Sequence, residues 1–193
     1  MVLSTSISKV LKSTKYDESL VKNIDEIKNQ IKNSPFLGCF IADKDGKTLF
    51  KFEIFQGALD FSIKWDTKNE ARKSCLDIEL IPMFISALER FSQEINIKDL
   101  PGFKLEGKNI KLETLFSFDN YSIIFILNPK VNLNLVKERI EKYFTYLFEV
   151  YKEDFGSKLK LSSIAFISHL ELLGKLWLED LNKNYLNLTQ QNS

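Results

Sequence analysis

Two short runs of this sequence are apolar at almost every position, and they constrain the fold more than any other feature. They span residues 37–42 (LGCFIA) and 121–127 (YSIIFIL). A strand that faces water on one side alternates apolar and polar residues, whereas a continuously apolar strand is buried on both faces. We therefore expect both runs at the middle of a sheet that helices cover on both sides.

Other strand-like segments alternate and belong toward the edges of that sheet. Residues 47–55 and 103–118 mostly alternate, and the turn Asp43–Gly46 precedes the first of them. This pattern predicts a β-hairpin followed, later in the chain, by a three-strand meander. Alternation over Leu59–Trp65 predicts a further strand, or a continuation of the hairpin past a bulge at Gly57.

Four segments carry apolar residues at helical spacing. They are residues 17–33, 81–95, 134–154 and 162–186. The order of helices and strands predicts an α/β protein of the α+β type. We expect a three-layer α/β/α sandwich around a mainly antiparallel sheet of five to six strands. We expect residues 1–16 to form a loose tail, 17–155 to form the domain, and 156–193 to form a helix docked on that domain plus a polar tail.

The helix over 81–95 has the clearest pattern of the four. Polar residues lie opposite its apolar face, namely Glu89, Arg90 and Gln93. The apolar face is predicted to be buried, and its members are Ile81, Phe84, Ile85, Leu88, Phe91 and Ile95.

Charge and cysteine usage narrow the class of protein. The chain has 193 residues, with 27 basic and 26 acidic side chains spread evenly along it. Such a balance argues against a nucleic-acid ligand, because phosphate backbones demand a basic surplus. Cys39 and Cys75 are too far apart for a metal knuckle or a disulfide framework. With no apolar leader and no run long enough to span a membrane, we expect a cytoplasmic protein.

No group of residues in the sequence indicates a particular catalysed reaction. His169 is the only histidine, so a zinc site or a histidine-assisted triad lacks partners. Asp43–Gly46 opens like a calcium loop, but the twelfth position, where a glutamate is needed, is Ile54. Asp154–Gly156 spells a kinase motif without a glycine-rich loop to accompany it. We therefore expect no cofactor, no metal and no enzymatic activity.

The segment Phe36–Phe50 (FLGCFIADKDGKTLF) resembles the opening hairpin of the roadblock/longin superfamily. The helix at 81–95, the meander at 103–127 and the helix at 134–154 follow in that superfamily's order. The resemblance covers about residues 17–155. It implies a longin-like, profilin-like fold and a non-catalytic scaffold or regulator of a small Ras-like GTPase, in vesicle trafficking or signalling.

The resemblance also implies a way of pairing. By analogy, dimers form through edge strands and the adjoining helix, which here means Phe103 and Leu105 with the helix face that bears Arg90 and Gln93. An edge strand has unpaired N–H and C=O groups, so strand pairing is physically reasonable. The expected partners are a small GTPase or another longin/roadblock-type protein, in a homodimer or heterodimer.

A second hypothesis is a small-molecule sensor of the PAS/GAF kind. It would hold an apolar ligand between the sheet and a helix, in a pocket lined by Phe52, Trp65 and Phe118. A third, an enzyme, lacks any catalytic constellation.

Overall fold

The computed structural model describes residues 18–64, 77–97, 100–118, 120–156 and 163–191. The chain divides into two compact units, residues 1–33 and 34–193. The first contains helix α2 (Glu18–Asn33), which confirms the helix predicted over 17–33. Pro35 follows shortly after it, as expected where proline disfavours helix in the preceding residue.

The second unit is built on one antiparallel sheet of five strands in the order β2-β1-β5-β4-β3. The strands are β1 (Phe36–Asp43), β2 (Thr48–Glu53), β3 (Gly102–Glu106), β4 (Lys111–Phe118) and β5 (Tyr121–Leu127). Both continuously apolar runs, β1 and β5, lie inside the sheet and pair with each other. Their position confirms the prediction, because a strand without a polar face needs cover on both sides.

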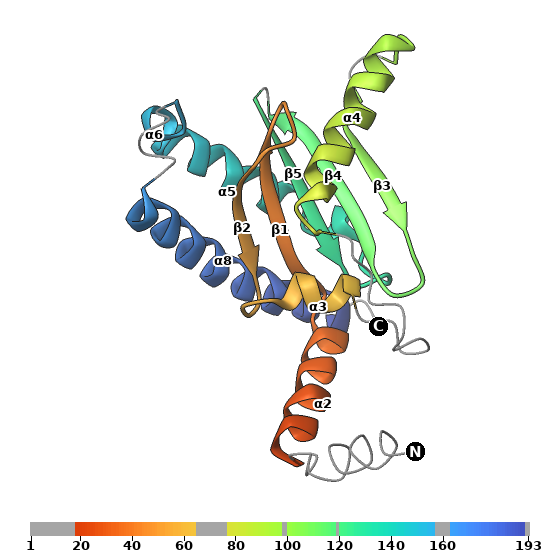
Figure 1. Cartoon of the computed structure of the whole chain (residues 1–193). Coiled ribbons are helices and arrows are strands. Elements are labelled where there is room, and N and C mark those ends of the chain that lie inside the picture. The colour runs from red at the N-terminus through yellow and green to blue at the C-terminus, as the bar shows by residue number, and fades with distance from the viewer. Residues whose placement is uncertain (1–17, 65–76, 98–99, 119, 157–162, 192–193) are drawn as a thin grey trace, which may run out of the picture. The chain divides into compact units, whose positions relative to one another are not determined.

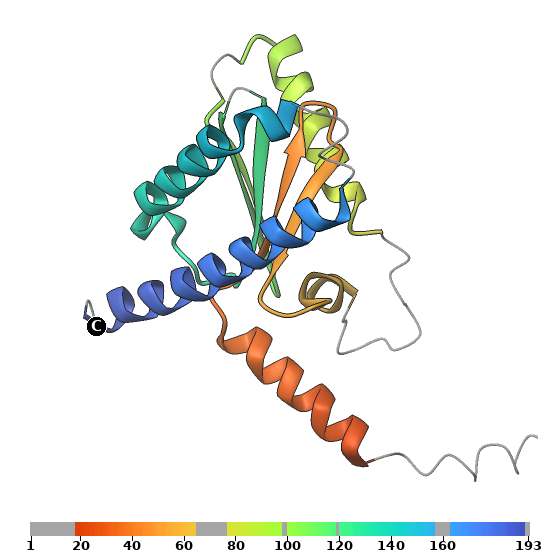
Figure 2. The same cartoon turned by 90° about the vertical axis from the view of Figure 1, so that its left-hand side faces the viewer.

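Helices cover both faces of this sheet (Figures 1 and 2). Helices α3 (Ala58–Lys64) and α4 (Leu80–Glu94) lie on one face. Helices α5 (Lys137–Val150) and α8 (Ile164–Gln191) lie on the other, joined through the short α6 (Lys152–Gly156), and a 3-10 turn at Leu133–Leu135 precedes α5. The predicted three-layer α/β/α sandwich is confirmed.

The predicted strand over Leu59–Trp65 is wrong, because the chain forms helix α3 there. The Glu53 carboxylate accepts hydrogen bonds from the backbone N–H groups of Gly57 (2.9 Å) and Leu59 (3.3 Å), which satisfies donors at the start of the helix. Gly57 has a positive φ of 84°, which turns the chain out of β2. Leu59 is fully buried and lies over Gly38, where an added Cβ would lie 3.0 Å from the Leu59 side chain and 2.3 Å from the Phe52 carbonyl oxygen.

The other long helices differ from prediction at their ends. The predicted helix 134–154 is divided into the 3-10 turn, α5 and α6. The last helix runs to Gln191, beyond the predicted end at 186. The segment after 186 is polar but has no glycine or proline to stop a helix, and the Thr189 hydroxyl bonds back to the carbonyl of Tyr185 (3.1 Å).

An aromatic core lies between the sheet and helices α5 and α8. Phe125 of β5 and Phe144 of α5 are fully buried, and the Trp177 ring of α8 lies 5.2 Å from that of Phe144. Tyr143 stacks on Trp177 with ring centroids 4.2 Å apart. Aromatic pairs of this kind contribute packing energy beyond the area they bury.

Helix α8 is held against the sheet by a close approach and by polar bonds. Its Gly174 faces Phe52 so closely that an added Cβ would lie 2.2 Å from the ring. The Asn182 side chain accepts from the backbone N–H of Phe36 (2.8 Å) and donates to its carbonyl (3.0 Å). The Tyr185 hydroxyl accepts from the backbone N–H of Asn132 (2.9 Å). These contacts join the last helix to β2, to the start of β1 and to the 3-10 turn that precedes α5.

Candidate protein-interaction surface

Helix α4 does not bury the face that its sequence predicts. Ile81 and Ile85 are buried, at 8% and 1% exposed. Phe84, Phe91 and Ile95, which share their helical spacing, are 54%, 56% and 53% exposed. The buried side of the helix instead includes polar residues, namely Ser86, Glu89 and Ser92. The predicted orientation, with Glu89 on the outer face, is therefore wrong.

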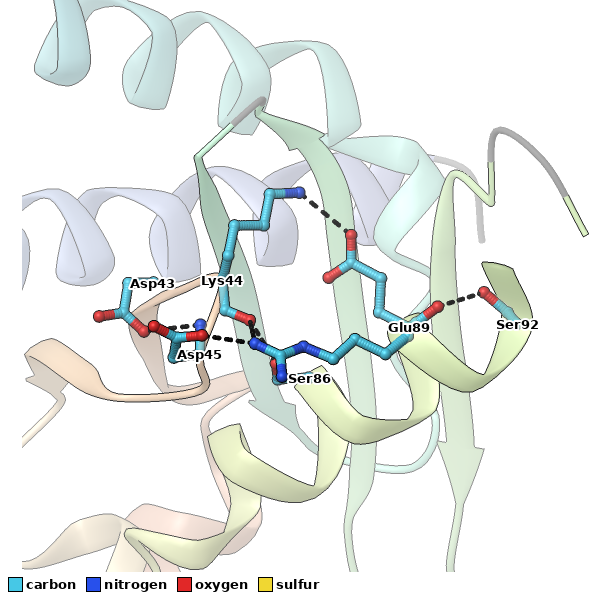
Figure 3. Close-up of polar contacts among 7 residues, drawn as sticks. Asp43, Lys44, Asp45, Ser86, Glu89 and Ser92 are labelled. Atoms are coloured by element: carbon cyan, nitrogen blue, oxygen red, sulfur yellow. Dashed lines mark hydrogen bonds and ion pairs between the residues drawn. The ribbon is translucent and has the colours of Figure 1, made fainter. Parts of the chain in front are cut away.

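Polar bonds between α4 and the β1–β2 turn set this orientation (Figure 3). The Ser86 hydroxyl donates to the Lys44 carbonyl (2.6 Å), and the Lys44 ammonium pairs with the Glu89 carboxylate (3.1 Å). Arg90 bonds to the same carbonyl (3.2 Å) and to the Asp45 carboxylate. These bonds hold the polar flank of α4 against the turn, so its apolar flank is left in solvent.

The conformation of the β1–β2 turn allows α4 to pack closely against it. The Asp43 carboxylate accepts from the backbone N–H groups of Asp45 (3.0 Å) and Lys47 (2.9 Å), which is an Asx-type turn and not a calcium loop. Gly46 has a φ of 79°, and a Cβ at this position would lie 2.6 Å from the Cα of Met83. Glycine therefore serves both the turn and the close approach of α4.

The exposed flank forms what we call the α4 strip. Its members are large apolar side chains, each between 46% and 56% exposed: Leu80, Met83, Phe84, Phe91, Ile95 and Ile97. Four of them, at 80, 84, 91 and 95, recur at spacings of four and seven residues, so they lie along one side of the helix. Contiguous apolar surface of this kind marks interaction sites on soluble proteins.

The edge strand β3 presents apolar residues on the same face of the sheet as α4. Directly opposed residues in antiparallel strands point to the same face. Successive partners run from Phe103 through Thr114 and Ile124 to Phe40. Phe40 shares its face with Gly38, which lies under α3. Phe103 and Leu105 therefore face the α4 layer, and Leu105 is 39% exposed.

The four residues predicted for the interface fall into two groups. Phe103 and Leu105 share a face with α4, as just described. Arg90 and Gln93 are exposed, but Arg90 is bound to the β1–β2 turn, on the opposite flank from the strip. Sequence periodicity predicts that three members of the strip, Phe84, Phe91 and Ile95, lie in the core. The apolar residues of this helix, however, span a wider arc than one contact with a sheet can cover.

Two of the three residues predicted for a ligand pocket, Phe52 and Phe118, pack against other parts of the protein. Phe52 is 1% exposed and lies against Gly174. The Phe118 ring lies 6.1 Å from that of Phe144 and 5.2 Å from that of Phe148. Trp65 lies outside the described residues. An open hollow of about 160 Å³ lies elsewhere, at the start of β3, where its lining includes Gly102, Phe103, Thr114 and Leu133.

The surroundings of Cys39 and His169 point to structural roles and not to catalysis. Burial raises the pKa of the Cys39 thiol, which is fully buried and therefore a poor nucleophile. His169 is exposed, and its Nε2 lies 3.2 Å from the Tyr151 hydroxyl, which joins α8 to the end of α5. Among the described residues, no cluster of three or more acidic, histidine or cysteine side chains could hold a metal ion.

The order of hairpin, helix, meander and helices around an antiparallel sheet matches the architecture that residues 36–50 implied. The fold is roadblock/longin-like. No protein-family model and no curated protein matches the sequence. No helix in the described ranges is long and apolar enough to cross a membrane.

Three solved structures of MglB are similar to this chain. Myxococcus xanthus MglB is 16% identical, with a TM-score of 0.43, over 61% of this chain and 85% of that one. The gliding protein MglB of Thermus thermophilus is 9% identical, with a TM-score of 0.39, over 61% and 79%. An MglB described with a tetrameric arrangement is 9% identical, with a TM-score of 0.42, over 68% and 90%.

Proposed function

We propose that this protein is a cytoplasmic, non-catalytic interaction module that acts as a scaffold or regulator of a small Ras-like GTPase, in trafficking or signalling. The roadblock/longin resemblance of residues 36–50 supports the partner class. The observation that carries the proposal is the α4 strip, six large apolar side chains about half exposed within 18 residues of sequence (80 to 97).

The strip is a favourable surface for a protein partner. Fully burying one large apolar side chain is worth about 1.5–3 kcal/mol, so covering the exposed half of each contributes about 1 kcal/mol. A partner that covers most of the strip therefore gains several kcal/mol before the costs of association. The neighbouring β3 edge adds main-chain hydrogen-bonding groups that can accept a strand from a second protein of the same fold.

The test is nucleotide-dependent capture from lysate of the native cell. The protein is immobilised and exposed to lysate with GDP or with a non-hydrolysable GTP analogue, and bound proteins are identified by mass spectrometry. The test variant is Phe84→Ser/Phe91→Ser. The matched control is Leu172→Ser/Leu176→Ser on α8, since these side chains are as exposed as the strip residues, at 57% and 55%.

We expect a small GTPase to be enriched in one nucleotide state, lost with the strip variant and kept with the control. Absence of any small GTPase in both states, with folded wild-type protein, would contradict the proposal. Equal capture by both variants would keep the partner class and reject the strip as its binding surface.

A further inference from the structure

The hollow at the start of β3 lies between the sheet and the segment that leads into α5. Its wall consists of Leu133 and Asn134 in the 3-10 turn and Lys137 at the start of α5. Its floor consists of two directly opposed residue pairs of β3 and β4, which are Gly102 with Leu115 and Lys104 with Glu113. Successive residues of a strand point to opposite faces, so this floor lies on the face away from Phe103 and from α4.

Gly102 leaves the floor of the hollow open. An added Cβ at this position would lie 2.0 Å from the carbonyl oxygen of Thr114, so no side chain can project from β3 here. Leu115 and Leu133, at 5% and 1% exposed, give the interior its apolar surface. The volume of about 160 Å³ is close to that of a cavity that holds one benzene molecule. The hollow therefore has room for a small molecule with an apolar body.

Polar bonds fix the wall of the hollow relative to its floor. The Lys111 ammonium, which is 2% exposed, donates to the Val131 carbonyl and ties β4 to the segment before the 3-10 turn. The Asn132 side chain accepts from the backbone N–H of Asn134 (3.2 Å), and the N–H of Asn132 donates to the Tyr185 hydroxyl of α8 (2.9 Å). The hollow is thus formed before any ligand binds, as small-molecule sites usually are.

The charged side chains of the lining leave a surplus of positive charge. They are two lysines, Lys104 and Lys137, and one carboxylate, Glu113. Glu113 is paired with Lys111 at 3.2 Å, and water screens this pair little because Lys111 is buried. Each of the two lining lysines is paired with a glutamate on its own element, at 3.2 and 3.8 Å. These are solvent-accessible pairs, which are weak, so an anion in the hollow can compete for both ammonium groups.

We propose that this hollow binds a small molecule that combines an apolar body, about the size of one ring, with a single carboxylate or phosphate group. The apolar body packs against Leu115 and Leu133, and the anionic group meets the ammonium groups of Lys104 and Lys137. A lysine ammonium is a point charge with three rotatable donors, which suits either anion. Asn134 adds an amide to the same wall.

This site differs from the ligand pocket that the sequence predicts. That pocket was expected at Phe52, Trp65 and Phe118 and for a wholly apolar ligand, whereas the hollow has a charged lining. The hollow also lies on the sheet face opposite the α4 strip, so it does not depend on the partner that the strip binds. The proposal therefore goes beyond the proposed function and does not rest on it.

The test is a titration of the full, nitrogen-labelled chain followed by heteronuclear NMR. Benzoate and phenyl phosphate are the probes, and their separate titrations show which anion the site prefers. Benzamide is the neutral control of the same shape. We expect the amide signals of Gly102 and Leu115 to shift saturably with at least one anion, with a Kd in the millimolar range or lower, and not with benzamide. No saturable shift up to about 10 mM, or equal shifts with benzamide, would overturn the proposal.

Two variants locate the site. Lys137→Gln should raise the Kd of the preferred anion at least about threefold. Its matched control is Lys142→Gln, because Lys142 is also on α5 and also pairs with a glutamate one turn away, Glu138 at 2.7 Å, but does not line the hollow. Asn134→Trp should abolish binding by filling the hollow. Asn134 is exposed, so the fold should tolerate this change, and thermal melting checks it.

The outcomes separate this proposal from the proposed function. Equal affinities of the Lys137 and Lys142 variants, or undiminished binding by folded Asn134→Trp, would overturn the proposed ligand site. Capture of a small GTPase by either protein would still support the proposed function, because the hollow and the α4 strip lie on opposite faces of the sheet.

Discussion

Glycine at position 174 allows α8 to lie directly on the sheet. The helix approaches β2 so closely that the ring of Phe52 fills the space where a side chain would begin, with ring atoms 2.2 to 2.4 Å from an added Cβ. Glycine in a helix interior costs about 1 kcal/mol relative to alanine. Here the cost is offset by contact between the helix backbone and a fully buried aromatic ring, which no larger residue permits.

We expect Gly174→Val to lower the free energy of unfolding by about 1–3 kcal/mol or more, because the added methyl groups overpack a filled core. Lys175→Val is the control, since it places the same side chain at an exposed position of the same helix. Urea unfolding followed by circular dichroism measures both. Equal stability of the two variants would contradict the close approach.

Burial gives Cys39 and Tyr143 a measurable effect of pH on stability. Burial raises the pKa of both groups, so the folded state keeps protons that the unfolded chain releases. The stability that these protonated groups contribute is fully present at neutral pH. It is lost as the pH rises above about 8.5, first through the cysteine, and each group can lower the free energy of unfolding by up to about 1.4 kcal/mol per pH unit.

The measurement is urea unfolding from about pH 7 to about pH 10, across the cysteine range. We expect Cys39→Ala to be less stable at neutral pH, because it leaves a cavity. Its stability should also decline less steeply with pH than that of the wild type. Parallel declines in the two proteins would show that Cys39 is not the group responsible.

At the scale of elements, α4 shows how polar bonds can decide which face of an amphipathic helix is buried. Ser86 reaches the Lys44 carbonyl, and the half-buried pair of Lys44 with Glu89 lies beside it. A helix oriented by its apolar arc alone would turn Phe84 and Phe91 inward. The exposed strip is therefore a consequence of the bonds on the opposite flank.

We expect Ser86→Ala to lower the free energy of unfolding by about 1 kcal/mol, since it removes one hydrogen bond in a buried position. Arg90→Ala should cost no more than about 1 kcal/mol, because its partner Asp45 is exposed and water screens the pair. Gln93→Ala, on the exposed side of the helix, is the control. A larger loss for Arg90→Ala than for Ser86→Ala would contradict this ranking.

Elements with a strong pattern were predictable, and the exceptions have local causes. The strands β1 and β5 followed from apolar runs, and the β1–β2 turn from Asp43 and Gly46. The strand predicted at 59–65 is wrong because so short a segment has too few positions to distinguish the two-residue period of a strand from the 3.6-residue period of a helix. In addition, the Glu53 carboxylate bonds to the start of the helix, which the hydrophobic pattern alone does not show. The exposure of the strip was not predicted, because hydrophobic periodicity shows which side of a helix is apolar but not how much of that side the sheet covers.

At the scale of the whole molecule, contacts between the first strand, β1, and the last helix, α8, hold the two ends of the unit 34–193 together. Asn182 near the end of α8 satisfies both the N–H and the C=O of Phe36, which is fully buried at the start of β1. These residues are 146 positions apart in sequence. The last helix is thus part of the same cooperative structure as the first strand.

We expect Asn182→Leu to lower the free energy of unfolding by about 2–4 kcal/mol, because it leaves two buried backbone groups without partners. Leucine keeps a similar volume, so the loss reports the polar bonds and not a cavity. Lys183→Leu, at an exposed position, is the control.

Because α8 and β1 share these bonds, unfolding of the variant should still be a single transition. Tryptophan fluorescence, to which Trp177 on α8 contributes, and circular dichroism should give the same midpoint. Two separated midpoints would show that α8 detaches before the sheet unfolds, and that the ends of the unit are not energetically coupled.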